Sequence, residues 1–237
     1  MKRALMAALL MVMPVMAQQK EVKEERTTKL VHLKYVDPEA VQRMISQFGV
    51  TVMPNSQMKA MTLSGFAAQI AAAEAALQQL DVAPKNIELM VYFVVGSDQA
   101  NLTGSPVPAE IRDVIAQLKT TFTFKDYRML DVLTLRTRAG SQAETTGILD
   151  TKTSTPRLSM FSVRNATVSE DGTTVRLDRM HAGLRIPIFS QGAKTEYMNT
   201  GIDQDIDVKE GQKVVVGRAS LEGPEKALFL ILTARVL

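Results

Sequence analysis

Hydrophobic and polar residues change their spacing along the chain and so divide it into extended and helical segments. Residues 30–36, LVHLKYV, alternate between apolar and polar side chains, which is typical of a half-buried strand. Asp37 then offers an N-cap carboxylate, and Pro38 occupies a first helical position that needs no amide hydrogen. Four apolar residues at three- and four-residue spacing predict a helix with one apolar face, ended by Gly49. They are Val41, Met44, Ile45 and Phe48.

Two short strands and a second helix are predicted next. The strands cover residues 49–54 and 59–65 and are joined by a polar turn. Residues 66–81, FAAQIAAAEAALQQLD, read as a helix whose alanines favour helical structure and permit close packing on a sheet. Its apolar side carries Phe66, Ile70, Leu77 and Leu80. Residues 29–83 are therefore predicted to form a two-layer domain in the order strand, helix, strand, strand, helix.

Residues 86–237 follow a short linker and are predicted to be mostly extended. Residues 87–96, IELMVYFVVG, are apolar on both faces, which suits a central strand. One further amphipathic helix is expected at residues 109–119. Strand candidates separated by turn signals fill the remainder, at 121–124, 127–138, 144–150, 157–169, 173–189, 194–208, 212–222 and 227–237. The predicted fold class is α+β, with an antiparallel second region.

Residues 227–237, ALFLILTARVL, form a strongly apolar strand candidate. One face would carry Leu228, Leu230, Leu232, Ala234 and Val236, and the other Phe229, Ile231 and Leu237. A strand that is apolar on both faces is normally covered on both, whereas an exposed edge of this kind would promote aggregation. We therefore expect it inside a sheet, flanked by other strands or by a neighbouring subunit.

Residues 1–17 have the features of a secretory signal peptide. Two basic residues precede an unbroken apolar stretch, and the small residue Ala17 comes before Gln18, which places the expected cleavage between them. A transmembrane anchor is the alternative, but about 20 apolar residues are needed to cross a bilayer and this run is shorter. The mature chain is predicted to be exported, with residues 18–28 as a flexible polar leader.

The amino-acid composition limits the kinds of molecule that this protein is expected to bind. The sequence contains no cysteine, which excludes a structural disulfide and a lipid-modified N-terminal cysteine. Losing Lys2 and Arg3 with the signal peptide leaves 26 basic and 25 acidic residues, so the mature chain is nearly neutral. Such a chain exerts little electrostatic attraction on nucleic acid, and the GXXG loop of an RNA-binding KH domain is absent. No nucleic-acid partner is expected.

Two segments resemble one protein family. Leu30 to Asp81, with LVHLKYVDPEAVQRMI leading to MTLSGFAAQIAAAEAALQQLD, is similar to the short periplasmic ring-building domain of bacterial secretins, the NolW-like domain. Residues 206–237, IDVKEGQKVVVGRASLEGPEKALFLILTARVL, resemble the hairpin and final strand of the secretin core. The resemblance implies homo-oligomerisation, or docking to a secretion or pilus apparatus, in the periplasm or at the outer membrane.

This sequence also departs from the secretin pattern. It is much shorter than a gate-forming secretin and lacks most of one, and only residues 184–189 are similar to the lip motif of the family. Arg218 stands where the hairpin usually has its second glycine. The resemblance therefore implies an envelope protein made of secretin-like parts.

Residue types that can catalyse reactions or bind metals are present, but they do not occur in the motifs or at the spacings that these functions require. No nucleophile elbow, zinc-protease, P-loop or dinucleotide motif is present, and His32 and His181 lie far apart in the sequence. Three carboxylates alternate in one strand candidate and suit a solvated face better than a calcium site. They are Asp203, Asp205 and Asp207. We predict no catalytic, cofactor-binding or metal-binding residue.

Three arginines in one region leave two interpretations open. Arg128, Arg136 and Arg138 could face a phosphate or an acidic partner, or lie on a solvated strand face, which the sequence favours.

The hypothesis that best fits these patterns is a non-enzymatic, exported envelope protein that assembles or docks through its first domain. One alternative is a small oligomeric outer-membrane pore of secretin-like type, for which the alternation in residues 127–138 is a partial match. The other is an exported enzyme of unknown type. Membrane association, if it occurs, is not expected to involve a transmembrane helix.

Overall fold

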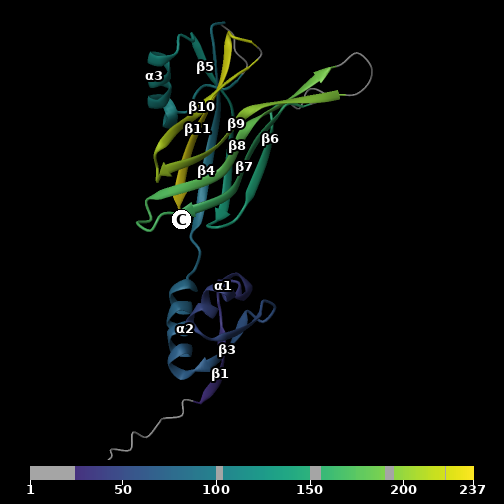
Figure 1. Cartoon of the computed structure of the whole chain (residues 1–237). Helices are drawn as coiled ribbons and strands as arrows, with labels where there is room; N and C mark the ends of the chain where they lie inside the picture. The colour runs from purple at the N-terminus through teal and green to yellow at the C-terminus, as the bar shows by residue number, and fades with distance from the viewer. Residues whose placement is uncertain (1–24, 100–103, 150–155, 190–194, 222) are drawn as a thin grey trace, which may run out of the picture. The chain divides into compact units, whose positions relative to one another are not determined.

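The computed structural model describes residues 25–99, 104–149, 156–189, 195–221 and 223–237 (Figure 1). They form two units that divide between Ala83 and Pro84. The predicted signal peptide at residues 1–17, its cleavage between Ala17 and Gln18, and residues 18–24 of the predicted leader lie outside the described residues. Helices together with mostly antiparallel sheets confirm the α+β class.

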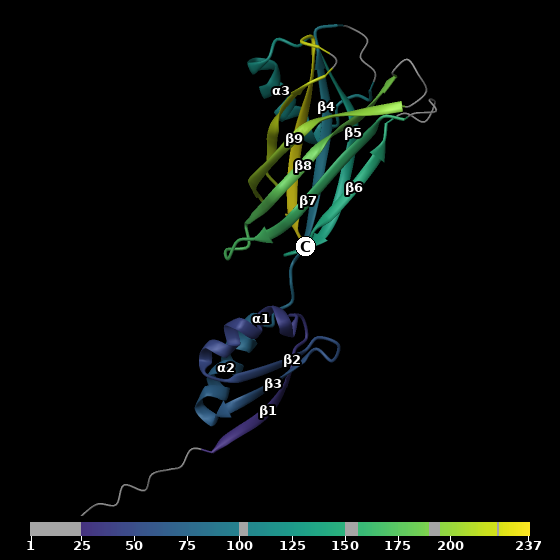
Figure 2. The same ribbon diagram turned by 45° about the vertical axis from the view of Figure 1, so that its right-hand side comes forward.

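Unit 1 is built from one small sheet and two helices. Its elements are β1 (Arg26–His32), α1 (Pro38–Ile45), the 3₁₀ helix η1 (Ser46–Phe48), β2 (Thr51–Asn55), β3 (Ala60–Phe66) and α2 (Ala67–Leu80). The antiparallel sheet has the order β1-β3-β2. Figure 2 shows both helices on the same side of the three strands. A single apolar core lies between the helices and the sheet, and it includes Val41, Ile45, Val52, Leu63, Ile70 and Leu77.

The capping signals predicted for the first helix are confirmed. The Asp37 carboxylate accepts a hydrogen bond of 3.0 Å from the Glu39 amide and one of 2.6 Å from the Ser56 hydroxyl. Pro38 is the first helical residue. Gly49 follows η1 with φ of 79°, in the left-handed region that glycine adopts without strain. These three positions define the ends of the α1–η1 segment from local sequence alone.

The first strand begins earlier than predicted, because β1 starts at Arg26 inside the segment expected to be a flexible leader. Residues 26–28 pair with Phe66, Gly65 and Ser64 of β3, and the Thr28 hydroxyl lies 2.9 Å from that of Ser64. β1 is an edge strand whose side chains are mostly exposed. Backbone hydrogen bonds to β3 therefore hold residues 26–28 in the sheet, and an exposed edge strand can carry polar side chains. For this reason hydrophobic alternation does not show where β1 begins.

Unit 2 contains two four-stranded antiparallel sheets and one helix. The first sheet has the order β10-β11-β4-β5, and the second has the order β6-β7-β8-β9. The strands are β4 (Asn86–Ser97), β5 (Asp126–Arg138), β6 (Ala143–Ile148), β7 (Leu158–Val168), β8 (Thr174–Phe189), β9 (Thr195–Lys209), β10 (Lys213–Ser220) and β11 (Lys226–Val236). Between β4 and β5 lie η2 (Ala109–Ile111) and α3 (Arg112–Thr121).

The predicted interior position of the last strand is confirmed. β11 lies between β10 and β4, and both of its faces are buried. On one face Leu228, Leu230 and Leu232 belong to the core that the two sheets share. On the other, Phe229 and Ile231 pack in a second core with residues of α3, which lies against this sheet in Figure 1. An all-apolar strand thus finds a sheet on one side and a helix on the other.

Residues 121–124 do not form the predicted strand. Thr121 is the last residue of α3, and the aromatic residues after it pack on β11 instead of pairing in a sheet. The ring centroid of Phe229 lies 5.1 Å from that of Phe122 and 5.9 Å from that of Phe124. The sequence TFTF therefore forms a loop that covers the sheet. The rings of Phe122 and Phe124 both pack on Phe229, although the backbone of this segment does not pair with a strand.

Arg218 has a packing role that explains an arginine at this place in the hairpin. Its guanidinium carbon lies 5.7 Å from the ring centroid of Phe122 and 5.6 Å from that of Phe124. A guanidinium at this distance is attracted to the face of an aromatic ring. A glycine here would leave these two rings without that contact.

Candidate assembly surfaces

The first helix exposes half of the apolar stripe that its sequence predicts. Val41 and Ile45 enter the core, but Met44 is 50% exposed and Phe48 is 38% exposed. They line a groove of about 410 Å³ between α1–η1 and α2, together with Gln47, Ala76, Gln79 and Leu80. The small side chain of Ala76 on α2 leaves room opposite the larger apolar groups. We call this feature the helix groove; none of its described lining residues is charged.

A second uncharged surface, which carries two large exposed apolar side chains, lies on the side of the sheet that the helices leave uncovered. Leu30 pairs in register with Thr62, which pairs with Met53, so the three side chains form a row across the sheet. Leu30 is 54% exposed and Met53 is 68% exposed. Thr28, Ser64 and Thr51 form the neighbouring row on the same face. We call these two rows the open sheet face; all six side chains are uncharged.

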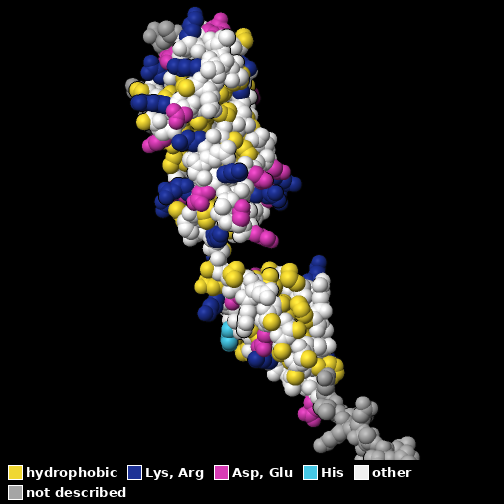
Figure 3. All heavy atoms as spheres, turned by 90° about the vertical axis from the view of Figure 1, so that its left-hand side faces the viewer, with side chains coloured by type: hydrophobic (Ala, Val, Ile, Leu, Met, Phe, Trp, Pro, Cys, Tyr) yellow, Lys and Arg dark blue, Asp and Glu magenta, His cyan; other side chains and the backbone are white. Residues whose placement is uncertain are grey.

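The two surfaces lie on opposite sides of unit 1, because successive residues of a strand point to opposite faces of the sheet. Val31, Met61 and Val52 point toward the helices, whereas their neighbours Leu30, Thr62 and Met53 point away. Figure 3 views unit 1 from the side of α2 and shows hydrophobic side chains spread over it, with few charged groups between them. A domain this small thus exposes apolar groups on both of its layers.

Asp81 holds the loop between β1 and α1 against the end of α2. Its carboxylate accepts backbone hydrogen bonds from Lys34 and Tyr35, both of 2.8 Å, and from Val36 at 3.1 Å. Burial by itself would raise the pKa of this carboxyl group. The three amide hydrogen bonds and the charge of Lys34 outweigh it and hold the pKa below its ordinary value of 3.8.

We expect Asp81→Ala to lower the free energy of unfolding of unit 1 by about 2 kcal/mol, since three amides lose a charged acceptor. A carboxylate with a depressed pKa stabilises the fold above its unfolded-state pKa and loses that contribution as pH falls through the folded-state value. The Asp81 contribution should therefore be complete above about pH 4 and decline below it. Urea unfolding at pH 7 and pH 3 measures both effects, and an equal loss in Asp81→Ala at the two pH values would contradict this role.

The three aspartates of β9 lie on one exposed face, as predicted. Each has its own partner on β8: the Asp203 carboxylate lies 2.7 Å from His181 Nδ1, and Asp207 pairs with Arg176 at 3.1 Å. Asp205 accepts a 2.6 Å hydrogen bond from the backbone amide of Arg179. Among the described residues no group of three or more His, Cys, Asp or Glu side chains is placed to hold a metal ion. These carboxylates therefore serve the β8–β9 pairing.

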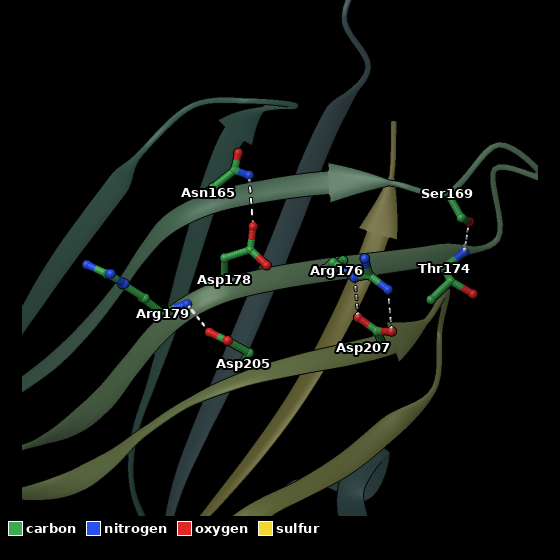
Figure 4. A network of polar contacts seen from close by, with 8 residues as sticks. All are labelled: Asn165, Ser169, Thr174, Arg176, Asp178, Arg179, Asp205 and Asp207. Atoms are coloured by element: carbon green, nitrogen blue, oxygen red, sulfur yellow. Dashed lines mark hydrogen bonds and ion pairs between the residues drawn. The ribbon is translucent and has the colours of Figure 1, made fainter.

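A β-bulge in β8 explains the position of Asp205. Asp178 and Arg179 stand opposite this single residue of β9, and Arg179 adopts φ of 49°, in the left-handed region. Figure 4 shows the Asp205 carboxylate at the Arg179 amide and the Asn165 amide at the Asp178 carboxylate, the latter a hydrogen bond of 2.9 Å. The side chains thus provide partners at the point where the sheet ladder is interrupted.

The remaining residues singled out from the sequence have separate places. His32 is exposed on β1. Arg128 pairs with Asp126 at 3.0 Å and Arg136 pairs with Glu88 at 2.6 Å, while Arg138 is exposed. Arg128 stands opposite Val95 of β4 and Arg136 stands opposite Glu88, and these two residues point to opposite faces of that strand, so the structure does not bring the three arginines to one face of β5. No described helix is long and apolar enough to cross a membrane.

Tyr127 of β5 lines a groove of about 390 Å³ beside α3, together with the cationic residues Arg112, Lys119 and Arg128. The tyrosine is 5% exposed, and its buried hydroxyl has no hydrogen-bond partner among the described residues. Burial and the charge of Asp98 raise the pKa of Tyr127.

We expect Tyr127→Phe to leave the stability of unit 2 unchanged or to raise it by up to about 1 kcal/mol, because it removes an unpaired buried hydroxyl. Thermal unfolding compared with wild type tests this expectation. A clear decrease would show that the hydroxyl has a partner in the folded protein.

Comparison with known proteins gives a consistent result for the fold. No family model and no curated protein matches the sequence. The type II secretin GspD from enteropathogenic Escherichia coli matches with a TM-score of 0.59 and 12% identity, over 89% of this chain and 87% of that one. The InvG secretin domain of the Salmonella SPI-1 injectisome matches with a TM-score of 0.56 and 13% identity, over 90% and 88%. The V. cholerae type IV competence pilus secretin PilQ matches with a TM-score of 0.58 and 11% identity, over 90% and 77%.

These matches extend over both units of the chain, whereas the sequence resemblance covered only its two ends. The fold of this protein is therefore secretin-like. Sequence reasoning identified the fold from residues 30–81 and 206–237, but it did not find the exposed surfaces of unit 1. The alternation of residues 30–36 contained a signal for the open sheet face, because it places Leu30 and Val31 on opposite faces.

Proposed function

We propose that this protein is a non-enzymatic, exported envelope protein that forms homo-oligomers through unit 1, a ring-building domain, and acts in protein secretion or pilus machinery. The secretin-like fold supports the type of system, and the predicted signal peptide supports a location in the periplasm or at the outer membrane. One observation carries the assembly role: unit 1 exposes large apolar side chains in uncharged surroundings on its two opposite sides, in the helix groove and on the open sheet face.

The positions of the two surfaces favour a head-to-tail contact. A surface that bound its own kind would give closed dimers, whereas two different surfaces that bind one another repeat from copy to copy. Such a contact closes into a ring when its rotation allows. In this arrangement the row of Leu30, Thr62 and Met53 on one copy packs against Met44 and Phe48 of the next. Each contact would remove exposed apolar area from water without burying a charge.

A mixing experiment tests the head-to-tail contact. Phe48→Glu places a charge in the helix groove, and Met53→Glu places one on the open sheet face. We expect each variant of residues 18–237 to be monomeric in light scattering without detergent, at concentrations where the unmodified chain forms a discrete oligomer. An equimolar mixture of the two variants should form a dimer and nothing larger, because it retains one intact pair of surfaces.

Met58→Glu is the matched control, since Met58 is 62% exposed in the turn between β2 and β3 and belongs to neither surface. It should assemble like the unmodified chain. An unmodified chain that stays monomeric would refute self-assembly. Variants that remain monomeric when mixed would refute the head-to-tail contact in particular.

The pore hypothesis stays a prediction, and the residues that suggested it have another explanation. In β5, which contains the alternating segment 127–138, Leu133 and Leu135 are buried in the core of unit 2. Thr134 and Arg136 are exposed between them. Packing within the unit is sufficient to account for this alternation.

A further inference from the structure

The methionines of unit 1 that the structure describes divide sharply by exposure. Met61 is buried in the core, whereas Met44, Met53 and Met58 are all at least half exposed. A methionine sulfur that solvent reaches can be oxidised, while one in a packed core is protected. The sequence contains no cysteine, so methionine is the residue type that supplies oxidisable sulfur in this chain.

Two of these exposed methionines occupy the surfaces assigned to assembly. Met44 lines the helix groove beside Phe48. Met53 stands in the row with Leu30 and Thr62 on the open sheet face. In a head-to-tail contact one methionine comes from each side, so every interface in an oligomer contains both.

We propose that Met44 and Met53 are modification sites for a two-electron oxygen donor such as hydrogen peroxide, and that their oxidation prevents self-assembly. The inference rests on the proposed function. In the reaction the thioether sulfur of methionine gains one oxygen atom and becomes a sulfoxide, while hydrogen peroxide is reduced to water. No further reactant is required.

The physical consequence follows from the change in polarity. A thioether is apolar and flexible, which suits it to fill an uneven apolar groove, whereas a sulfoxide is polar and chiral. In the proposed contact Met44 and Met53 meet the apolar side chains of Phe48 and Leu30, and the hydroxyl and amide groups of the two surfaces are neutral, so closing the contact would strip water from the sulfoxide oxygen without full replacement. Assembled copies would cover both sulfurs, so the oxidant acts on free copies before they assemble.

The test uses the mature chain, residues 18–237, diluted until it is monomeric and then treated with hydrogen peroxide. Peptide mass mapping should find Met44, Met53 and Met58 oxidised before the buried Met61. After the peroxide is removed, we expect the concentration needed for assembly, measured by light scattering, to rise at least tenfold. Methionine sulfoxide reductases should restore assembly, which separates this effect from irreversible damage.

Leucine substitutions show which methionines cause the loss of assembly, because leucine is apolar and of similar size but cannot be oxidised. The double variant Met44→Leu/Met53→Leu should need the same concentration for assembly after peroxide treatment as before it. The matched control Met58→Leu should stay as sensitive as the unmodified chain.

The outcomes separate this inference from the proposed function. If the untreated chain does not assemble, both are overturned. If it assembles equally well with sulfoxides mapped at both positions, or if the double leucine variant loses assembly on treatment, the oxidation sites are refuted and the assembly role stands.

Discussion

Phe229→Ala is expected to lower the free energy of unfolding of unit 2 by about 4 kcal/mol, because truncating a fully buried phenylalanine removes its transfer free energy and leaves a cavity. Phe229 is completely buried near the middle of β11. Its ring centroid lies 5.1 Å from Phe122 and 5.9 Å from both Phe124 and Tyr127, so three aromatic contacts are lost together.

Urea unfolding followed by near-ultraviolet circular dichroism measures this loss, since Tyr92 and Tyr127 lie in the same apolar core and report on its packing. Ile148→Ala is the matched control, because Ile148 ends β6 with an exposed side chain. It should change the stability by less than about 1 kcal/mol. Equal effects of the two substitutions would contradict the central position of Phe229.

Gly183→Ala is expected to cost about 3 kcal/mol through overpacking between β8 and β9. Gly183 pairs directly with Gly201, and the backbones approach so closely that an added Cβ would lie 2.5 Å from the backbone oxygen of Thr200 and 2.8 Å from the Cα of Gly201. Relief of this clash requires two strands to separate, because both neighbouring atoms belong to the backbone.

Gly217→Ala provides the contrast for this prediction. A Cβ at Gly217 would lie 2.7 Å from the Cδ1 atom of Ile202, which is the far end of a flexible side chain. Rotation of that side chain relieves the contact, so the cost should be below about 1 kcal/mol. Urea unfolding of both variants measures the two losses of unfolding free energy. A cost at Gly183 no larger than that at Gly217 would show that β8 and β9 separate easily at this position.

The two units differ in how other elements of the chain cover their apolar residues. In unit 2, sheet residues with both faces apolar find partners within the chain, since the second sheet covers one face of β11 and α3 covers the other. In unit 1, Val41 and Ile45 of the first helix pack in the core. The apolar residues Met44, Phe48, Leu30 and Met53 lie outside it. Exposed apolar groups of this kind commonly mark an interaction site. Unit 2 also exposes apolar residues such as Ile148 and Met198, so the grouping of the apolar residues of unit 1 on two opposite surfaces is the reason for proposing assembly there.

Local sequence determined most of the elements of this protein. The Asp37–Pro38 start and Gly49 end of the first helical segment, the type of nearly every later strand, and the interior position of β11 all followed from spacing, capping and turn chemistry. These features depend on neighbouring residues in the chain, so the sequence contains the information that specifies them. The secretin resemblance likewise came from residues 30–81 and 206–237.

Tertiary structure decided which apolar residues are covered and which polar groups meet. The start of β1 at Arg26 depends on pairing with β3, and the packing of Phe122 and Phe124 depends on the distant Phe229. The sequence marks Asp81 only as the end of a helix, whereas in the folded chain its carboxylate accepts hydrogen bonds from three amides of a loop far from it in sequence. Helical periodicity could not show that Met44 stays exposed, because periodicity gives the direction of a side chain and only the folded chain determines whether another element lies there.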